Sequence, residues 1–196
     1  MDLKKLSEPL TVEQIEFRIQ SVNGYGKAII LPYKDARVDI NRLNDVCGGL
    51  WARSHSRDNK NCAISIYNKD ISEWVSREDT GTESNADAQK GLASDSFKRA
   101  GTNWGIGIEL YSYPVISLKL NGGGNKNDSG IEYFLNASKK DRWGNPKAET
   151  GWGFKLKEWK WKSEFTDGKI SFLAAQDQNQ KRRFTWGEMK PKGENK

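Results

Sequence analysis

Apolar residues between positions 84 and 107 recur every three or four positions, the spacing of an α-helix with one buried face. Ser84 and Asp87 have the character of an amino-terminal cap and place the first turn near residue 85. We therefore predict a helix that ends near Thr102, stopped by Gly101, Gly105 and Gly107. Its buried face would consist of Ala88, Leu92, Ala93, Phe97 and Ala100.

Two more helices are predicted before this one. Thr11 and Gln14 form a capping box, and the residues after Thr11 follow a helical period, so we expect a helix whose buried stripe is Val12, Ile15, Ile19 and Val22. Asp35 caps the second helix, which is stopped by Gly48 and Gly49. The inward residues of that second helix are Ile40, Leu43 and Cys47.

The remaining apolar positions mostly alternate with polar ones, the pattern of a strand with one buried face. A first strand is expected over 27–33. Runs at 50–57, 61–68 and 73–79 are separated by short polar turns, which predicts an antiparallel three-stranded meander with the long helix laid across it. A strand at 115–120 is followed by a segment rich in Gly and Asn, and we expect 121–151 to be loop or a variable insertion.

The carboxyl-terminal part predicts a β-hairpin. Asp167-Gly168 is a hairpin turn between strands at 152–162 and 169–175, with a bulge near Glu158, and 181–186 forms a last strand. In this arrangement four lysines would share one face of the sheet, namely Lys155, Lys157, Lys160 and Lys162. The fold class is thus α+β, with one domain over 1–187 and a disordered tail at 188–196.

Composition narrows the class of partner. The 196 residues include 32 Lys plus Arg against 26 Asp plus Glu, a net charge of +6, which favours polyanions. Two cysteines cannot make a disulfide framework, and no apolar stretch is long enough to span a membrane. The first ten residues carry charges and no apolar core, so no secretory signal is predicted and a cytoplasmic location is expected.

Cations are concentrated on one face of the long predicted helix. Lys90, Ser94 and Lys98 are spaced four apart, and Arg99 lies about 100° round the helix from Lys98. The pair Lys98-Arg99 suits the phosphates of a nucleic acid. Equally, Asp95 lies four residues before Arg99 and can pair with it, in which case this is only a solvated helix face.

The run from Lys90 to Ala100, followed by Asn103-Trp104-Gly105 and closed by Gly107, resembles the signature helix of the Rad-fifty-two family of single-strand annealing proteins, which includes phage recombinases. With gaps, the resemblance extends back through Trp51 and residues 37–44 to Phe17 and Arg18. It covers roughly the first 115 residues, and nothing after Pro114 contributes to it.

The resemblance implies a groove for single-stranded DNA lined by Lys98 and Arg99. Arg18 matches another arginine of that groove, and Tyr33 matches a tyrosine close to it. Lys90 matches a basic position, supported by Lys27. Where the family has a further arginine three residues after the pair, this chain has Thr102.

The implied function is annealing of complementary DNA strands in recombination and repair, by a host-cytoplasmic protein if the gene is of phage origin. Such a protein is not an enzyme: it would need no ATP, cofactor or metal, and no phosphate-binding Gly-rich loop with a Gly-Lys-Ser/Thr ending occurs in the chain. The expected partners are single-stranded DNA and its complement, further copies of the chain in a ring or helical filament, and a partner exonuclease or single-strand binding protein, with no membrane.

Two other functions stay open from the residues alone. A magnesium-dependent nuclease would use Glu158 and Lys160 on a strand with Asp141 upstream, since such groups hold a metal and position water. A basic module could bind nucleic acid without annealing it. The single histidine, His55, has no partners at catalytic or zinc-binding spacing and is interpreted as an ordinary strand residue.

Overall fold

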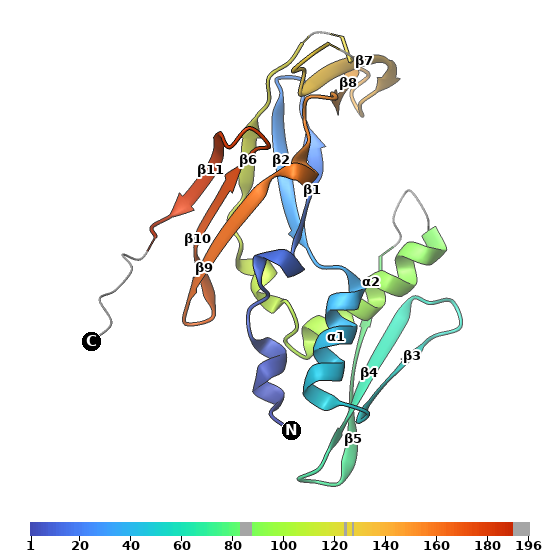
Figure 1. Cartoon of the computed structure of the whole chain (residues 1–196). Helices are drawn as coiled ribbons and strands as arrows, with labels where there is room; N and C mark the ends of the chain where they lie inside the picture. The colour runs from blue at the N-terminus through green and yellow to red at the C-terminus, as the bar shows by residue number, and fades with distance from the viewer. Residues whose placement is uncertain (83–87, 124, 127, 190–196) are drawn as a thin grey trace, which may run out of the picture. The chain divides into compact units, whose positions relative to one another are not determined.

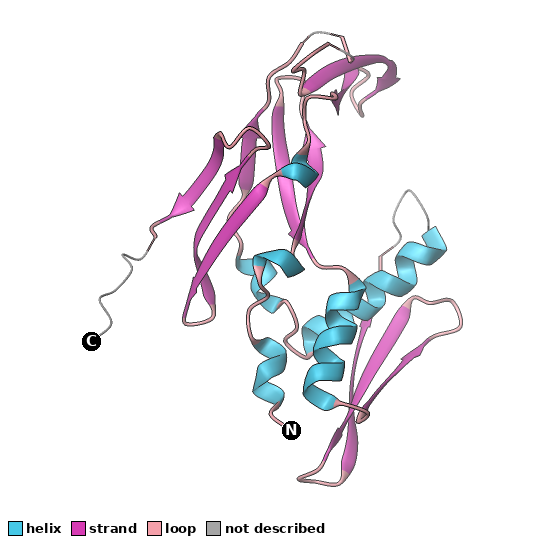
Figure 2. Ribbon diagram, viewed as in Figure 1, coloured by secondary structure: helices cyan, strands magenta, loops and turns pink. Residues whose placement is uncertain are grey.

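The computed structural model describes residues 1–82, 88–123, 125–126 and 128–189, and of 88–90 only the backbone. The chain folds as two compact units: Met1–Glu16 with Lys34–Ser112, and Phe17–Tyr33 with Tyr113–Lys196 (Figure 1). The sequence predicted a single domain over 1–187, whereas each unit is assembled from two separate segments. The α+β class with mostly antiparallel sheets is confirmed. Both α-helices of the described residues belong to the first unit, and the regular elements of the second are strands apart from one short 3-10 turn (Figure 2).

The first unit consists of two α-helices, a three-stranded sheet and short 3-10 turns. The strands β3, β4 and β5 are antiparallel neighbours in chain order, and α2 packs on β4 and β5. In chain order its elements are η1 (Leu3–Ser7), η2 (Val12–Gln14), α1 (Ala36–Cys47), β3 (Trp51–His55), β4 (Asn61–Asn68), β5 (Glu73–Thr80), α2 (Ala88–Asn103) and η3 (Ile108–Ser112).

The core of this unit forms where the sheet meets α2. Alternate residues of β4, namely Cys62, Ile64 and Ile66, are buried against Phe97 and Ala100 of the helix. The Trp104 indole donates to the carbonyl of Ile64 at 3.0 Å, which satisfies its buried N–H. Cys47 is also buried, so both cysteines are core residues as predicted, and burial raises the pKa of Cys62 to about 11.

The helix ends follow the local sequence signals. The carboxylate of Asp35 accepts from the backbone N–H of Arg37 at 2.8 Å and caps α1, which ends at Gly48 with φ +59°. Gly105 ends α2 with φ +96°. The Ile106 N–H bonds back to the Gly101 carbonyl, and the Gly105 N–H to that of Thr102, a Schellman motif.

Gly101 does not stop α2 as predicted but lies inside it. A Cβ at this position would lie 2.1 Å from Oδ1 of Asp39 on α1, so the two helices can approach this closely only over a glycine. The predicted cap at Ser84 and Asp87 lies outside the described residues, and so do most of those in the predicted tail.

The second unit contains two three-stranded antiparallel sheets and a separate hairpin. One sheet has the order β1-β2-β6, the other β11-β10-β9, and apolar residues of both share one core. The elements are β1 (Glu16–Val22), β2 (Lys27–Tyr33), β6 (Ile116–Lys119), β7 (Tyr133–Lys140), β8 (Pro146–Thr150), η4 (Leu156–Glu158), β9 (Lys160–Thr166), β10 (Lys169–Gln176) and β11 (Arg182–Gly187).

The helix predicted after Thr11 is wrong. The capping contact forms, with the Thr11 N–H donating to Oε1 of Gln14 at 3.0 Å, but it holds only the 3-10 turn η2. The chain then becomes β1, in which Phe17 and Ile19 alternate with polar residues. Phe17 stacks on Trp161 with ring centroids 3.7 Å apart, so packing in the second unit selects the strand over the competing helical period.

Two further expectations need correction. Within 121–151, predicted as loop or insertion, β7 and β8 pair as an antiparallel hairpin. The strand predicted over 152–162 is interrupted, because η4 occupies Leu156–Glu158 and β9 begins only at Lys160. The four lysines therefore do not share one sheet face. The hairpin at Asp167-Gly168 and the last strand are confirmed.

None of the helices in the described part of the chain has the length and apolar character that crossing a bilayer demands.

Candidate nucleic-acid interface

The six residues that the sequence selects for DNA binding are divided between the two units. The second unit holds Arg18, Lys27 and Tyr33, and α2 of the first holds Lys90, Lys98 and Arg99. The side chain of Lys90 lies outside the described residues. The geometry below therefore concerns each group by itself.

Arg99 makes an ion pair, but not with the predicted partner. Its Nε lies 3.2 Å from Oδ1 of Asp79 on β5, and its side chain keeps 42% of its surface exposed. Asp95 instead accepts from the backbone N–H and the hydroxyl of Thr82. An ion pair as exposed as Arg99–Asp79 is worth roughly 0–1 kcal/mol, so a phosphate can compete for this guanidinium.

Lys98 lies on a different side of α2 from Arg99 and is half-buried. Among the described residues its ammonium has no hydrogen bond or ion pair. Burial lowers the pKa of Lys34 and raises that of Asp39, and the charge of Lys98 adds to the first shift and opposes the second, which places Lys98 close to these two groups. Thr102, which stands where the resembled family has an arginine, donates its hydroxyl to the Lys98 carbonyl at 3.0 Å.

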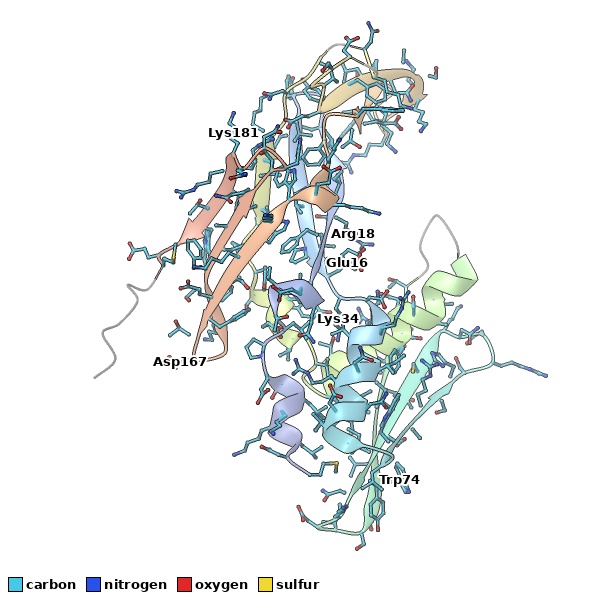
Figure 3. All side chains as sticks on the ribbon, viewed as in Figure 1. Glu16, Arg18, Lys34, Trp74, Asp167 and Lys181 are labelled. Carbon is cyan, nitrogen blue, oxygen red and sulfur yellow. The ribbon has the colours of Figure 1, made fainter. Side chains whose placement is uncertain are left out.

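Below Lys98 lies a buried polar cluster that connects α1 to the segment after α2. The Lys34 ammonium lies 2.5 Å from Oδ1 of Asp39, with side chains 5% and 0% exposed, and it also donates to the carbonyl of Ile106 (Figure 3). Glu109 is buried too, and its Oε1 accepts from the backbone N–H of Leu10 at 2.7 Å. Within the described residues, the second carboxylate oxygens of Asp39 and Glu109 have no hydrogen-bond partner.

Burial dominates the titration of this pair. Loss of solvation lowers the pKa of Lys34 and raises that of Asp39 to about 6, although each ion favours the charged form of the other. The opposite charges of Lys34 and Asp39 offset one another, so the pair adds no net positive charge beside Lys98.

Two arginines of the sheet flank α2. The guanidinium of Arg53 on β3 lies 5.0 Å from the ring centroid of Phe97, and that of Arg77 on β5 lies 4.4 Å from that of Trp104. Arg77 also donates to the backbone carbonyl of Asn103 at the end of the helix. Cations thus lie on both edges of α2, which is what a track for phosphates needs.

In the second unit the structure brings Arg18 and Tyr33 together. The Arg18 guanidinium lies 4.9 Å from the ring centroid of Tyr33, and Arg18 itself is exposed on β1 (Figure 3). Lys27 starts β2 and Tyr33 ends it, so these two lie about 20 Å apart along the strand. Lys27 therefore lies on a different part of the surface of this unit from Arg18 and Tyr33.

The residues of the nuclease hypothesis do not form a metal site. Glu158 lies in η4 rather than on a strand, half exposed and 3.6 Å from the ammonium of Lys155. Asp141 accepts from the backbone N–H groups of Trp143 and Asn145 and closes a turn. In the ranges that the structure describes, no three His, Cys, Asp or Glu side chains are arranged to hold a metal ion.

Over 114 residues the chain is 29% identical to the single-stranded DNA-binding protein DdrA of Deinococcus radiodurans, and this stretch makes up 57% of the present chain and 55% of that protein. The chain thus spans about half the length of this relative. No family model matches the sequence, and no solved structure matches it. Likeness to a single-stranded DNA-binding protein agrees with the predicted ligand class, whereas membership of the Rad-fifty-two family stays a prediction.

Sequence reasoning missed the buried cluster and the partner of Arg99. Lys34 and Glu109 are far apart in the chain and follow no periodic pattern, so nothing indicated that both would be buried. Asp79, the last residue of the strand predicted over 73–79, is in β5 and faces α2, but nothing in the sequence indicated that it would pair with Arg99. Only the register of β5 against β4, which places Asp79 opposite Cys62, could have indicated that Asp79 faces α2.

Proposed function

We propose that this protein binds single-stranded DNA and, without ATP, promotes the pairing of complementary strands. The observation that carries the proposal is the likeness to a single-stranded DNA-binding protein over more than half of the chain. The positive net charge and the cations along α2 support the same ligand. Annealing, a part in recombination or repair, and the absence of catalytic activity belong to the proposal as well.

In this mechanism α2 contacts the DNA backbone. Lys98 offers a cation without a described partner, and Arg99 exchanges its exposed pairing with Asp79 for a phosphate. Phosphate contacts carry no sequence information, so they hold a strand while its bases stay free to pair.

Annealing follows if two strands are held close together while their phosphate charges are neutralised. Stacking and base pairing then supply the driving force, and no nucleotide hydrolysis is needed. Assembly of several copies into a ring or filament would join the α2 surfaces into a continuous track. A partner exonuclease or single-strand binding protein would supply or protect the strand.

The first test is the affinity of Lys98→Ala/Arg99→Ala for a fluorescent oligothymidylate, measured by anisotropy at low salt. We expect at least about a tenfold loss, because two charge-assisted phosphate contacts disappear. Lys4→Ala/Lys5→Ala is the matched control: it removes an adjacent, exposed pair from the same unit and changes the net charge equally. Equal affinities of the two double variants would overturn the role of α2.

The second test separates annealing from binding. Complementary oligonucleotides that carry a donor and an acceptor dye are mixed with the protein and no nucleotide, and energy transfer reports their pairing. Faster pairing in the wild type than in Lys98→Ala/Arg99→Ala supports annealing. Tight binding without faster pairing would reduce the protein to a binding module.

A further inference from the structure

The hairpin of β7 and β8 ends in an exposed aromatic and basic tip. Residues Asp141 to Asn145 form the turn, and within it the Trp143 side chain has 70% of its surface exposed. The guanidinium of Arg142 lies 4.0 Å from the centroid of that indole. A ring this open to water leaves a large aromatic surface accessible for contact.

Hydrogen bonds within the turn fix the backbone that carries this ring. Oδ1 of Asp141 accepts from the N–H groups of Trp143 and Asn145, both at 2.9 Å. The backbone of Asp141 bonds to that of Asn145 and of Gly144, whose φ of +84° is the left-handed conformation that glycine adopts readily. Presentation of Trp143 therefore costs little additional ordering when a ligand binds.

Charge on the hairpin favours an anion. Glu149 is engaged by Lys139 at 2.6 Å, and this hydrogen bond lowers its pKa. The carboxylate of Asp141 is used within the turn. Three further cations of the hairpin are exposed, and the first of them packs on the indole: Arg142, Lys140 and Lys147.

The base of the hairpin is anchored in the second unit. Tyr133 packs on the turn between β1 and β2, where a Cβ at Gly26 would lie 2.3 Å from its ring. Next to Tyr133, Glu132 is held by a bidentate ion pair with Arg183 at 2.6 and 2.9 Å. Lys27 begins β2 beside this turn, so a residue first selected for DNA binding lies at the same end of the unit.

We propose that the β7–β8 hairpin is a contact surface for single-stranded DNA, on which a base stacks against the Trp143 indole while Lys140, Arg142 and Lys147 engage the neighbouring phosphates. The inference rests on the proposed function for the identity of the ligand and assigns it a surface that no part of the α2 argument uses. Stacking on an aromatic ring between cations is how proteins hold single strands irrespective of sequence.

Trp74 provides the internal comparison. It is also exposed, at 53%, but it lies on β5 between acidic residues and packs edge-on against Tyr67 at 5.6 Å (Figure 3). Glu73 precedes it and Glu78 follows on the same strand. Exposure alone therefore does not predict a DNA contact, and Trp74 is a control of the same residue type whose ring packs on another aromatic ring instead of on a guanidinium.

The experiment uses the full chain labelled with 5-fluorotryptophan, with the fluorine signals of Trp143 and Trp74 assigned from Trp143→Phe and Trp74→Phe. On titration with a short oligothymidylate, we expect the Trp143 signal to shift and the Trp74 signal to stay. An abasic strand of equal length, which offers phosphates without bases, should leave Trp143 nearly unmoved. Trp143→Ala should bind oligothymidylate about tenfold more weakly, whereas Trp74→Ala should bind normally.

The outcomes separate the two proposals. Normal binding of oligothymidylate with a stationary Trp143 signal overturns the hairpin contact and leaves the proposed function intact. An equal shift with the abasic strand overturns base stacking, because phosphates alone would then account for it. Absence of any binding to single-stranded DNA refutes the proposed function, and the hairpin contact fails with it.

Discussion

The charged face of α2 and the tip of the β7–β8 hairpin both place cations beside aromatic rings, but the two regions hold their charges differently. On α2 the cations are half-buried, and one of them is paired with Asp79 across the sheet. On the hairpin an open indole carries one guanidinium on its ring and shares the hairpin with two other exposed cations, and the nearby carboxylates are used by Lys139 and by the turn. The α2 cations lie on a helix that packs in the core of the first unit, whereas the hairpin tip is exposed to solvent.

This difference separates two ways of meeting a nucleic acid. On a helix that also forms the core, replacing a cation disturbs the packing. Cations fixed in this way suit the regular phosphate backbone. A hairpin tip can change without disturbing a core, and its indole suits the more variable bases. Variants should accordingly affect stability and binding together in the first region, and binding alone in the second.

The largest expected effect is a loss of stability when the buried ion pair of Lys34 and Asp39 is broken. Lys34→Met leaves the fully buried carboxylate of Asp39 without its counterion, and removal of one partner of a buried pair typically costs about 3–5 kcal/mol. Urea unfolding followed by circular dichroism at pH 7 measures this loss. Trp143→Ala on the exposed hairpin tip should leave the unfolding midpoint nearly unchanged.

Two checks accompany this prediction. Lys34→Met/Asp39→Asn removes the unpaired charge and should recover part of the stability. The single variant should also lose less at pH 5 than at pH 7, because the unpaired carboxyl then binds a proton and becomes neutral. An equal loss at both pH values would show that Lys34 acts through packing and not through its charge.

The second prediction compares the salt dependence of binding. Each phosphate contact to a single strand contributes about 0.7 to the slope of log affinity against log salt. Lys98→Ala/Arg99→Ala should therefore lower the slope by about 1.4. Trp143→Ala should weaken binding without changing the slope, because stacking releases no counterions. A flat salt dependence in the wild type would argue against phosphate contacts altogether.

A smaller effect is expected from releasing Arg99. Asp79→Asn preserves the shape of the side chain but removes the competing charge, so affinity for single-stranded DNA should rise about two- to threefold, in line with the modest strength of an exposed ion pair. Glu78→Gln, on the same strand but the opposite face of the sheet, makes the same change in net charge and is the control. If both variants gain equally, only net charge matters. If neither gains, Arg99 is a structural residue.

Local signals predicted the parts of the fold that local chemistry decides. Asp35 caps α1, Gly105 ends α2, and Asp167-Gly168 turns the last hairpin, each because a single backbone geometry is required there. The segment after Thr11 was misread because two periods overlap in it. Apolar residues also recur there at the spacing of a strand, at Ile15, Phe17 and Ile19. The strand forms because Phe17 stacks on Trp161, which is far away in the sequence.

The candidate site was harder to predict for the same reason. Adjacent cations on a helix were evident from the sequence, but their partners come from strands whose register is a property of the whole sheet. Asp79 reaches Arg99 only because β5 pairs with β4 at Cys62. Asp141-Arg142-Trp143 looked like part of a Gly and Asn-rich loop, and its conversion into a rigid tip depends on the pairing of β7 with β8.

The smallest predicted effect links the surface of α2 to its interior. Carbon-detected NMR should find Asp39 titrating at about 6, since burial raises its pKa from 3.8 against the opposing charges of Lys34 and Lys98. The folded protein then binds this proton more tightly than the unfolded chain, so the contribution of Asp39 to stability decreases as the pH rises from about 4 to about 6.

Lys98→Ala should raise the pKa of Asp39 further, whereas Lys69→Ala, on the β4–β5 turn, should not. Single-stranded DNA should shift it in the same upward direction as Lys98→Ala if a phosphate neutralises Lys98. If the pKa of Asp39 changes neither in Lys98→Ala nor on addition of DNA, the charge of Lys98 does not act on the buried pair. DNA binding at α2 would then not be coupled to the core.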